Sequence, residues 1–188
     1  MSQDNVVVVA IIGSARITED DVRWKEAYEL GRALAQNGFA VMTGGYGGLM
    51  AAAARGAFSE GGSTIGLPMS NWKHLTPDPS HIELRWADDY FARLAHLLSA
   101  DYVVVLDGGI GTLSEMSLAW AIAQTEIKHT QILVMGNGIK KLLDQFMDAL
   151  IISEKDMFLA KHFDSPAQVI DHLKTPPETN ADTGRARG

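Results

Sequence analysis

The sequence predicts a doubly wound α/β fold: a Rossmann-like parallel sheet with helices on both faces, three-layer α/β/α, in a single domain. Short apolar runs without alternation, typical of parallel strands buried on both faces, alternate with segments of helical periodicity. Glycine-rich turns follow three of these runs, at Gly13, Gly44 and Gly108. Ligands of such sheets bind at the carboxyl ends of the strands, so we expect these three turns to gather there.

Each element follows from local patterns. The first helix is predicted after Thr18, where three acidic residues suit the positive end of a helix dipole, and Asn37-Gly38 ends it. Its sheet-facing residues are predicted to be Ala27, Leu30 and Leu34. Strands are predicted at 6–12, 39–42, 63–67, 82–86, 102–106 and 131–135. Further helices are predicted in an alanine-rich segment ending at Phe58 and at 88–98, 112–125, 140–151 and 165–173.

The chain contains 188 residues, which suits one domain at 1–174 followed by a polar tail, 175–188, that we expect to be disordered. A net charge of −7 argues against a nucleic-acid polymer or an acidic membrane surface as partner. The sequence has no cysteine and no apolar run of the roughly 20 residues that a membrane span needs. These features favour a soluble, cytoplasmic protein with a small-molecule ligand.

An irregular stretch, 69–81, is long for a loop in a compact domain and is typical of a lid or mobile segment. It contains His74 and His81, which lack histidine or carboxylate partners at metal-ligand spacing. We therefore interpret both as solvated loop residues and predict no metal site.

The segment 107–115 joins a buried strand to a helix through a glycine-rich turn, which predicts an anion site. Glycines there can adopt positive φ and let the backbone approach a ligand, while free N–H groups of the first helical turn point at it. The predicted anion-binding residues of this segment are Gly108, Gly109, Gly111 and Thr112. The alternative is a glycine turn that only reverses the chain.

Two other nucleotide-binding patterns fit less well. In a dinucleotide fingerprint Ser114 would stand where the third small residue belongs, and no acidic residue closes the strand 131–135 to hold a ribose. No glycine turn is followed by the Gly-Lys-Ser/Thr of a P-loop, which excludes that motif.

These residues resemble the LOG ("Lonely Guy") family of cytokinin-activating phosphoribohydrolases, whose members are often mislabelled lysine decarboxylases. The family's PGGxGTxxE motif is matched by 107–115 except at its first position, and its GGGxxGLM loop by 44–50. The Gly13-Ser14 turn also fits, and the resemblance spans about 6–173. No lysine lies in the glycine-loop region to carry a pyridoxal Schiff base, so the decarboxylase label has no support.

The resemblance implies an enzyme that hydrolyses the N-glycosidic bond of a nucleoside 5′-monophosphate such as AMP, without metal or organic cofactor, usually as a dimer. It implies Glu115 and Arg93 as catalytic residues. The implied substrate- and phosphate-binding residues are Gly13, Ser14, Gly44, Gly45, Gly48, Met50, Gly108, Gly109, Gly111 and Thr112. A carboxylate near the ribose can stabilise an oxocarbenium-like state or activate water, although Glu115 could equally be an ordinary carboxylate of the first helical turn.

Two positions depart from the family pattern. Counted without gaps, the family's arginine position is Ala92, and Arg93 lies one residue later, a rotation of about 100° around a helix. Asp107 replaces the motif's proline, so its carboxylate must point away from a bound phosphate, pair with Arg16 or Arg93, or mark a different ligand. A non-catalytic nucleotide or molybdenum-cofactor carrier therefore remains the alternative to the hydrolase.

The predicted helix 112–125 carries apolar residues on nearly all sides. A monomer would expose a large apolar patch there, so the sequence predicts a homodimer through this helix, with the helix 88–98 alongside.

Overall fold

The computed structural model describes residues 6–125 and 131–175. Its strands are β1 (Val8–Ile12), β2 (Ala40–Thr43), β3 (Thr64–Gly66), β4 (Glu83–Leu84), β5 (Tyr102–Val105), β6 (Gln131–Val134) and β7 (Ala160–His162). Its helices are α1 (Val22–Gln36), α2 (Gly48–Ser59), α3 (Tyr90–Leu97), α4 (Ile110–Gln124), α5 (Asn137–Ala149), α6 (Glu154–Met157) and α7 (Pro166–Lys174). Within the described ranges the strands form one parallel sheet in the order β4-β3-β2-β1-β5-β6-β7.

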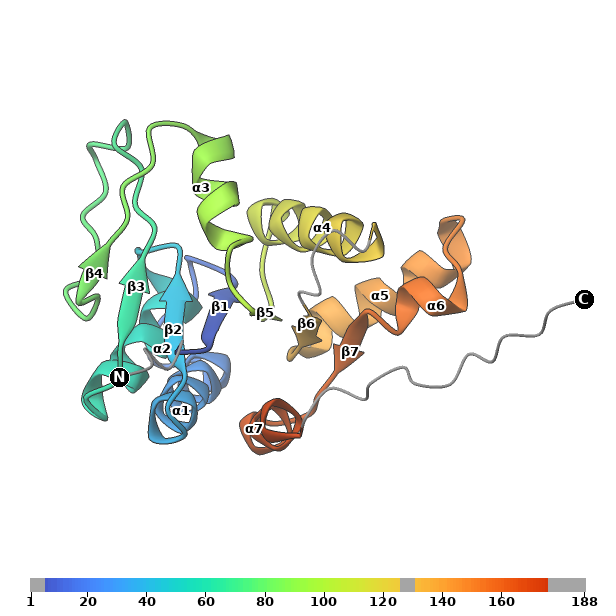
Figure 1. The fold of residues 1–188 in the computed structure, drawn as a ribbon, viewed down its shortest axis with the longest axis horizontal. Coiled ribbons are helices and arrows are strands. Elements are labelled where there is room, and N and C mark those ends of the chain that lie inside the picture. The colour runs from blue at the N-terminus through green and yellow to red at the C-terminus, as the bar shows by residue number, and fades with distance from the viewer. Residues whose placement is uncertain (1–5, 126–130, 176–188) are drawn as a thin grey trace, which may run out of the picture.

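The sheet is the middle of three layers, as the sequence predicts. Figure 1 shows α1, α2 and α7 along one face and α3, α4 and α5 along the other. Alternate residues of β1 divide between two cores: Val9 and Ile11 pack with α1, α2 and α7, whereas Ala10 and Ile12 pack with helices of the other face. The sheet-facing residues predicted for α1 are fully buried: Ala27, Leu30 and Leu34.

The direction in which the chain winds reverses between β1 and β5. β1 pairs with β2 on one side, where Ile11 lies opposite Thr43, and with β5 on the other, where Ile12 lies opposite Val105. Because the three strands end at nearly the same level, the turns that follow them meet at one edge of the sheet. This is the switch point at which ligands of doubly wound sheets bind.

Several element boundaries differ from the predicted ones. β7 and α6 are not predicted, because β7 is short with one buried residue, and α6 is a single turn closed by a capping box of Ser153 and Asp156. α4 begins at Ile110, two residues early, and α5 begins at Asn137 rather than Lys140. The predicted tail lies outside the described residues except for Thr175, and no described helix is long and apolar enough to cross a membrane.

Candidate functional site at the carboxyl edge of the sheet

The three glycine turns are joined through the backbone of Ser14. The Ser14 N–H donates to the Asp107 carbonyl oxygen at 2.9 Å, and the Ser14 carbonyl accepts from the Leu49 N–H at 2.9 Å. The turns after β1 and β5 and the first residues of α2 therefore form one backbone unit. The gathering of the turns that the sequence predicts is present in the structure.

The turn after β2 is closely packed. Gly45 and Gly48 have φ of 87° and 70°, a left-handed conformation that residues with a side chain rarely adopt. A Cβ on Gly48 would overlap the Ser14 carbonyl oxygen, and one on Gly45 would lie 3.2 Å from the Leu67 backbone nitrogen. Gly13 also lacks room, since its Cβ would come within 3.1 Å of the Leu106 Cβ. Gly45 and Gly48 thus permit contact between segments of backbone, and Gly13 permits close packing against the Leu106 side chain.

The turn after β5 is open at two of its glycines. An added Cβ on Gly109 or Gly111 would have no other atom within 4 Å, and both residues are exposed. Gly109 is the N-cap of α4 with φ −105°, and no side chain caps the helix there. The expectation that Gly108, Gly109 and Gly111 use positive φ is therefore wrong. Their lack of a side chain leaves space in front of the first turn of α4, while Gly108 makes room for the buried side chain of Thr112.

Arg93 and Glu115 form a buried ion pair between α3 and α4. The Arg93 Nη1 lies 2.7 Å from the Glu115 Oε1, and the two side chains are only 6% and 7% exposed. The Arg93 Nε donates to the Leu67 carbonyl at 3.0 Å, and the guanidinium lies 5.8 Å from the centroid of the Trp72 ring. Arg93, rather than Ala92, thus faces the carboxylate that the motif supplies.

The glycine turn after β2 reaches this pair. A Cβ on Gly44 would overlap the Arg93 Nη2, and it would lie 2.8 Å from the Met50 sulfur. Glycine at this position therefore admits the guanidinium, because any side chain would occupy its space. Residues of both family motifs, Gly44 and Met50 from one and Glu115 from the other, meet around Arg93.

The two charges do not compensate one another fully. Burial raises the pKa of Glu115, and the attraction and hydrogen bond of Arg93 offset only part of that rise. A carboxyl group whose pKa lies above its ordinary value takes up and releases a proton more readily near neutral pH than an exposed glutamate. Such a group suits general acid or base catalysis.

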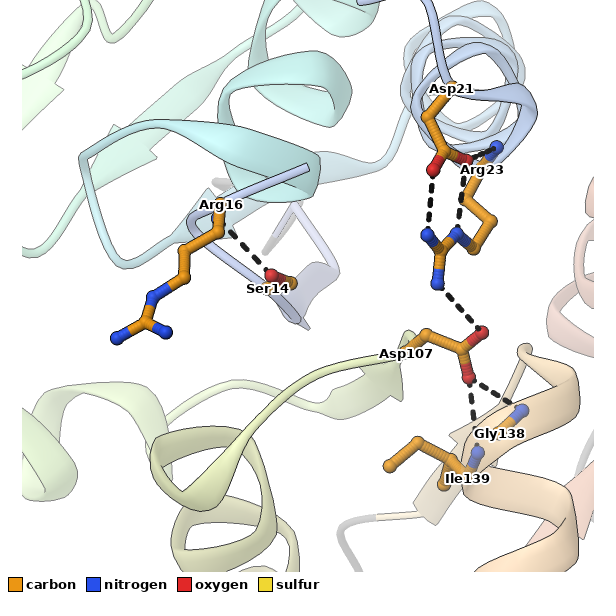
Figure 2. A network of polar contacts seen from close by, with 7 residues as sticks. All are labelled: Ser14, Arg16, Asp21, Arg23, Asp107, Gly138 and Ile139. Atoms are coloured by element: carbon orange, nitrogen blue, oxygen red, sulfur yellow. Dashed lines mark hydrogen bonds and ion pairs between the residues drawn. The ribbon is translucent and has the colours of Figure 1, made fainter. Parts of the chain in front are cut away.

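Asp107 points away from the space in front of α4. Figure 2 shows its carboxylate turned toward the start of α5, where Oδ1 accepts from the N–H groups of Gly138 at 2.8 Å and Ile139 at 3.0 Å. Its Oδ2 lies 3.9 Å from the Arg23 Nη1. The first of the three expected alternatives holds, and its partner is neither Arg16 nor Arg93. Repulsion of a bound phosphate by this carboxylate is correspondingly reduced.

Arg16 lies in the loop after β1, and its side chain extends in a different direction from Asp107 (Figure 2). Its backbone N–H donates to the Ser14 hydroxyl at 3.1 Å. Among the described residues no carboxylate forms an ion pair with its guanidinium, so this exposed charge is available to a ligand at the same edge of the sheet.

His81 supports the turn after β2, a role that the sequence does not reveal. It is 8% exposed, so the prediction of a solvated residue is wrong. Its Nδ1 lies 2.9 Å from the Asp78 carbonyl and its Nε2 2.7 Å from the Thr43 hydroxyl. Because a carbonyl only accepts, we assign the proton to Nδ1, and the Thr43 hydroxyl then donates to Nε2 while accepting from the Gly45 N–H at 3.1 Å. Burial lowers the pKa of His81.

A family model, that of the SLOG cluster4 family, matches residues 6–149. The chain belongs to this family. The resemblance to LOG proteins that the glycine motifs indicate therefore holds at the level of the SLOG group, and the match includes the three glycine turns, Arg93 and Glu115. In the described part of the chain no group of three or more histidine, aspartate or glutamate residues is placed to hold a metal ion.

An uncharacterized protein of Archaeoglobus fulgidus is 31% identical over 111 residues, which are 59% of this chain and 72% of that protein. Among solved structures, the molybdenum cofactor binding protein of Rippkaea orientalis aligns with a TM-score of 0.74 and 25% identity, over 91% of this chain and 97% of that one. The molybdenum cofactor carrier protein of Chlamydomonas reinhardtii aligns with a TM-score of 0.68 and 21% identity, over 90% and 96%. The latter likeness shows the fold alone.

Proposed function

We propose that this protein binds a nucleoside 5′-monophosphate such as AMP at the carboxyl edge of its sheet and hydrolyses the N-glycosidic bond. The products are the free base and ribose 5-phosphate. The observation that carries the proposal is the buried pair of Arg93 and Glu115 beside Gly44, next to an α4 N-terminus with open space before it. Membership of the SLOG cluster4 family supports it.

The phosphate would lie before the first turn of α4. Backbone N–H groups at the start of a helix, together with the helix dipole, favour an anion. Gly109 and Gly111 leave room for it, and the Arg16 guanidinium adds a positive charge from the loop after β1. Asp107, turned toward α5, leaves this position free of a facing carboxylate.

The chemistry would take place one helical turn further along α4. As the bond between C1′ and the base nitrogen breaks, positive charge develops on the ribose, and the Glu115 carboxylate stabilises it. Water then adds to C1′ and gives up one proton to Glu115, and Glu115 passes this proton to the base nitrogen, so that the ribose gains the hydroxyl group and the free base gains the hydrogen. Arg93 holds the Glu115 carboxylate in place through their hydrogen bond and favours its ionised form. Glu115 can therefore return to the ionised form after each proton transfer.

We also propose that the protein is a homodimer through α3 and α4. Apolar side chains on these helices remain accessible in the single chain: Phe91 is 81% and Ile110 is 82% exposed, and Leu113, Leu118 and Ile122 are half-buried. A two-fold interface would cover them. Light scattering should give about twice the 20.4 kDa of one chain, and a monomer mass at micromolar concentration contradicts the proposal.

A second candidate is a non-catalytic carrier of a nucleotide or of the molybdenum cofactor. The structural likeness to the Rippkaea orientalis protein, at 25% identity over nearly the whole of both chains, favours it. In that case Glu115 would accept a hydrogen bond from a bound hydroxyl or amine instead of assisting bond cleavage.

Incubation with AMP, followed by chromatography for adenine and ribose 5-phosphate, separates the two candidates. For the hydrolase we expect Glu115→Gln to lower turnover roughly a hundredfold or more, about 3 kcal/mol, with little change in AMP affinity. Arg93→Ala should also lower turnover, whereas Arg85→Ala, which removes a half-buried arginine paired with Glu83, should not. If the wild type binds AMP and releases no adenine over many hours, the carrier function replaces the hydrolase.

A further inference from the structure

A cavity opens at the same edge of the sheet, between the first turn of α1 and the start of α5, and neither Arg93 nor Glu115 lines it. It measures about 460 Å³, within the range of roughly 300–1,000 Å³ that is usual for small-molecule sites. It lies beyond the ends of β5, β6 and β7, where the first turn of α1 and the start of α5 form its walls. We call it the α1–α5 cavity.

The floor of the α1–α5 cavity is apolar. Leu49, Leu106 and Met135 line it, and all three belong to the core that packs with α1, α2 and α7. Phe163 and Val22 add apolar surface at its sides. Met116, next to Glu115 in the chain, belongs instead to the core of the other face. An apolar ligand body fits against such a floor.

The rim of the cavity is predominantly acidic. Four carboxylates line it, against one guanidinium and one imidazole; the carboxylates are Asp21, Glu26, Asp107 and Asp164. Asp21 forms two hydrogen bonds with the Arg23 side chain, at 2.6 and 3.0 Å, and these interactions lower the pKa of Asp21 to about 2. The guanidinium of Arg23 thus already forms ion pairs with Asp21 and Asp107, as Figure 2 shows.

The position in the cavity that would favour an anionic ligand, the N-terminus of α5, is already occupied by the Asp107 carboxylate. The N-terminus of α5 opens onto the cavity, and the Asp107 carboxylate accepts the N–H groups of Gly138 and Ile139 there. This carboxylate is the anion that a helix N-terminus favours, supplied by the protein itself. By contrast, no side-chain hydrogen bond or ion pair joins the Glu26 carboxylate to another described residue. It attracts the Arg23 guanidinium from a longer distance and lies at the rim, where a ligand can reach it.

We propose that the α1–α5 cavity is a second ligand site that takes a small organic cation, with an ammonium or amidinium head at the acidic rim and an apolar body against the floor. The proposal does not depend on the hydrolase function, because Arg93, Glu115 and Gly44 do not line this cavity. Charge complementarity supplies the selectivity, and burial of the apolar body supplies much of the affinity.

Three ligands with the same indole body and different charge test the proposal: tryptamine, tryptophol and indole-3-acetate. Methyl NMR of the full chain labelled at methionine gives separate reporters, because Met135 lines the cavity and Met50 lies beside Arg93 and Gly44. We expect tryptamine to shift the Met135 signal saturably, tryptophol to bind at least about tenfold more weakly, and indole-3-acetate to bind weakest. The Met50 signal should not move.

Glu26→Gln should weaken tryptamine binding severalfold, since it removes one exposed carboxylate from the rim. Its matched control is Glu29→Gln, the same change one turn along α1, where the carboxylate pairs with Arg32 and does not line the cavity. Equal affinity for the three ligands, a response of Met50 without Met135, or no response of Met135 at millimolar tryptamine would each overturn the proposal.

Discussion

The turns after β2 and β5 have the same glycine-rich character in the sequence and opposite physical roles in the structure. In the first, Gly45 and Gly48 have positive φ and touch backbone of neighbouring segments. In the second, Gly109 and Gly111 are exposed and face open space. Glycine is required for the fold in the turn after β2, whereas at Gly109 and Gly111 in the turn after β5 it leaves open space before α4.

The comparison leads to opposite expectations for added side chains. In the turn after β2 a methyl group should reduce stability, because segments of backbone must separate to admit it. At Gly109 or Gly111, in the turn after β5, it should leave stability intact and weaken binding of the proposed ligand. Substitutions in and around the two turns can test this contrast.

Gly48→Ala should have the largest effect on stability. Its φ of 70° strains any side chain, and its Cβ would overlap the Ser14 carbonyl oxygen, so we expect a loss of about 3 kcal/mol or more in the free energy of unfolding. Gly47→Ala is the matched control, because that Cβ would make only ordinary contact, 3.5 Å from the Ala15 oxygen, at φ −76°. Urea denaturation measures both, and equal stability of the two variants would contradict the packing argument.

Asp107→Ala should lower the free energy of unfolding by about 1–2 kcal/mol, as loss of a helix cap does. Two N–H groups of α5 lose their acceptor, while the contact with Arg23, half-exposed and 3.9 Å away, adds little. Asp107→Asn retains an acceptor oxygen and should recover part of the loss. If both variants have the same free energy of unfolding in urea as the wild type, the cap that Asp107 provides for α5 does not contribute to stability.

His81 should make stability depend on pH through the turn after β2. Its pKa is lowered by burial, so between its folded-state pKa and about 6.5 the unfolded chain binds a proton that the folded chain does not. Stability should therefore fall as the pH drops below about 6.5, by up to about 1.4 kcal/mol per pH unit until the folded-state pKa is reached. His81→Gln should flatten the dependence, and exposed His74→Gln should leave it unchanged; thermal melts at pH 5 to 8 measure the difference.

The sequence was sufficient to predict the strands that are buried on both faces, because a short apolar run without alternation, such as 102–105, is typical of a parallel strand in the middle of a sheet. It also predicted the meeting of the glycine turns, since the carboxyl ends of parallel strands share an edge. It could not predict how Asp107 and His81 are oriented, because Asp107 binds the start of α5 and His81 binds Thr43, in tertiary contacts between residues more than thirty positions apart. The register of Arg93 depended likewise on where Asp89 caps α3.

The sequence also did not predict that Gly111 lies within α4, because it placed the start of this helix at Thr112. Because α4 begins at Ile110, Gly111 lies inside the first helical turn rather than before it. Gly111→Ala should therefore stabilise the fold slightly, by up to about 0.5–1 kcal/mol, as alanine in place of a helical glycine does. The added methyl group enters the space before α4, so AMP should bind more weakly. Scanning calorimetry measures the stability, and calorimetric titration of a separate, unheated sample with AMP measures the affinity. A Gly111→Ala protein that melts at a lower temperature than the wild type and binds AMP normally would remove the distinction between the two turns.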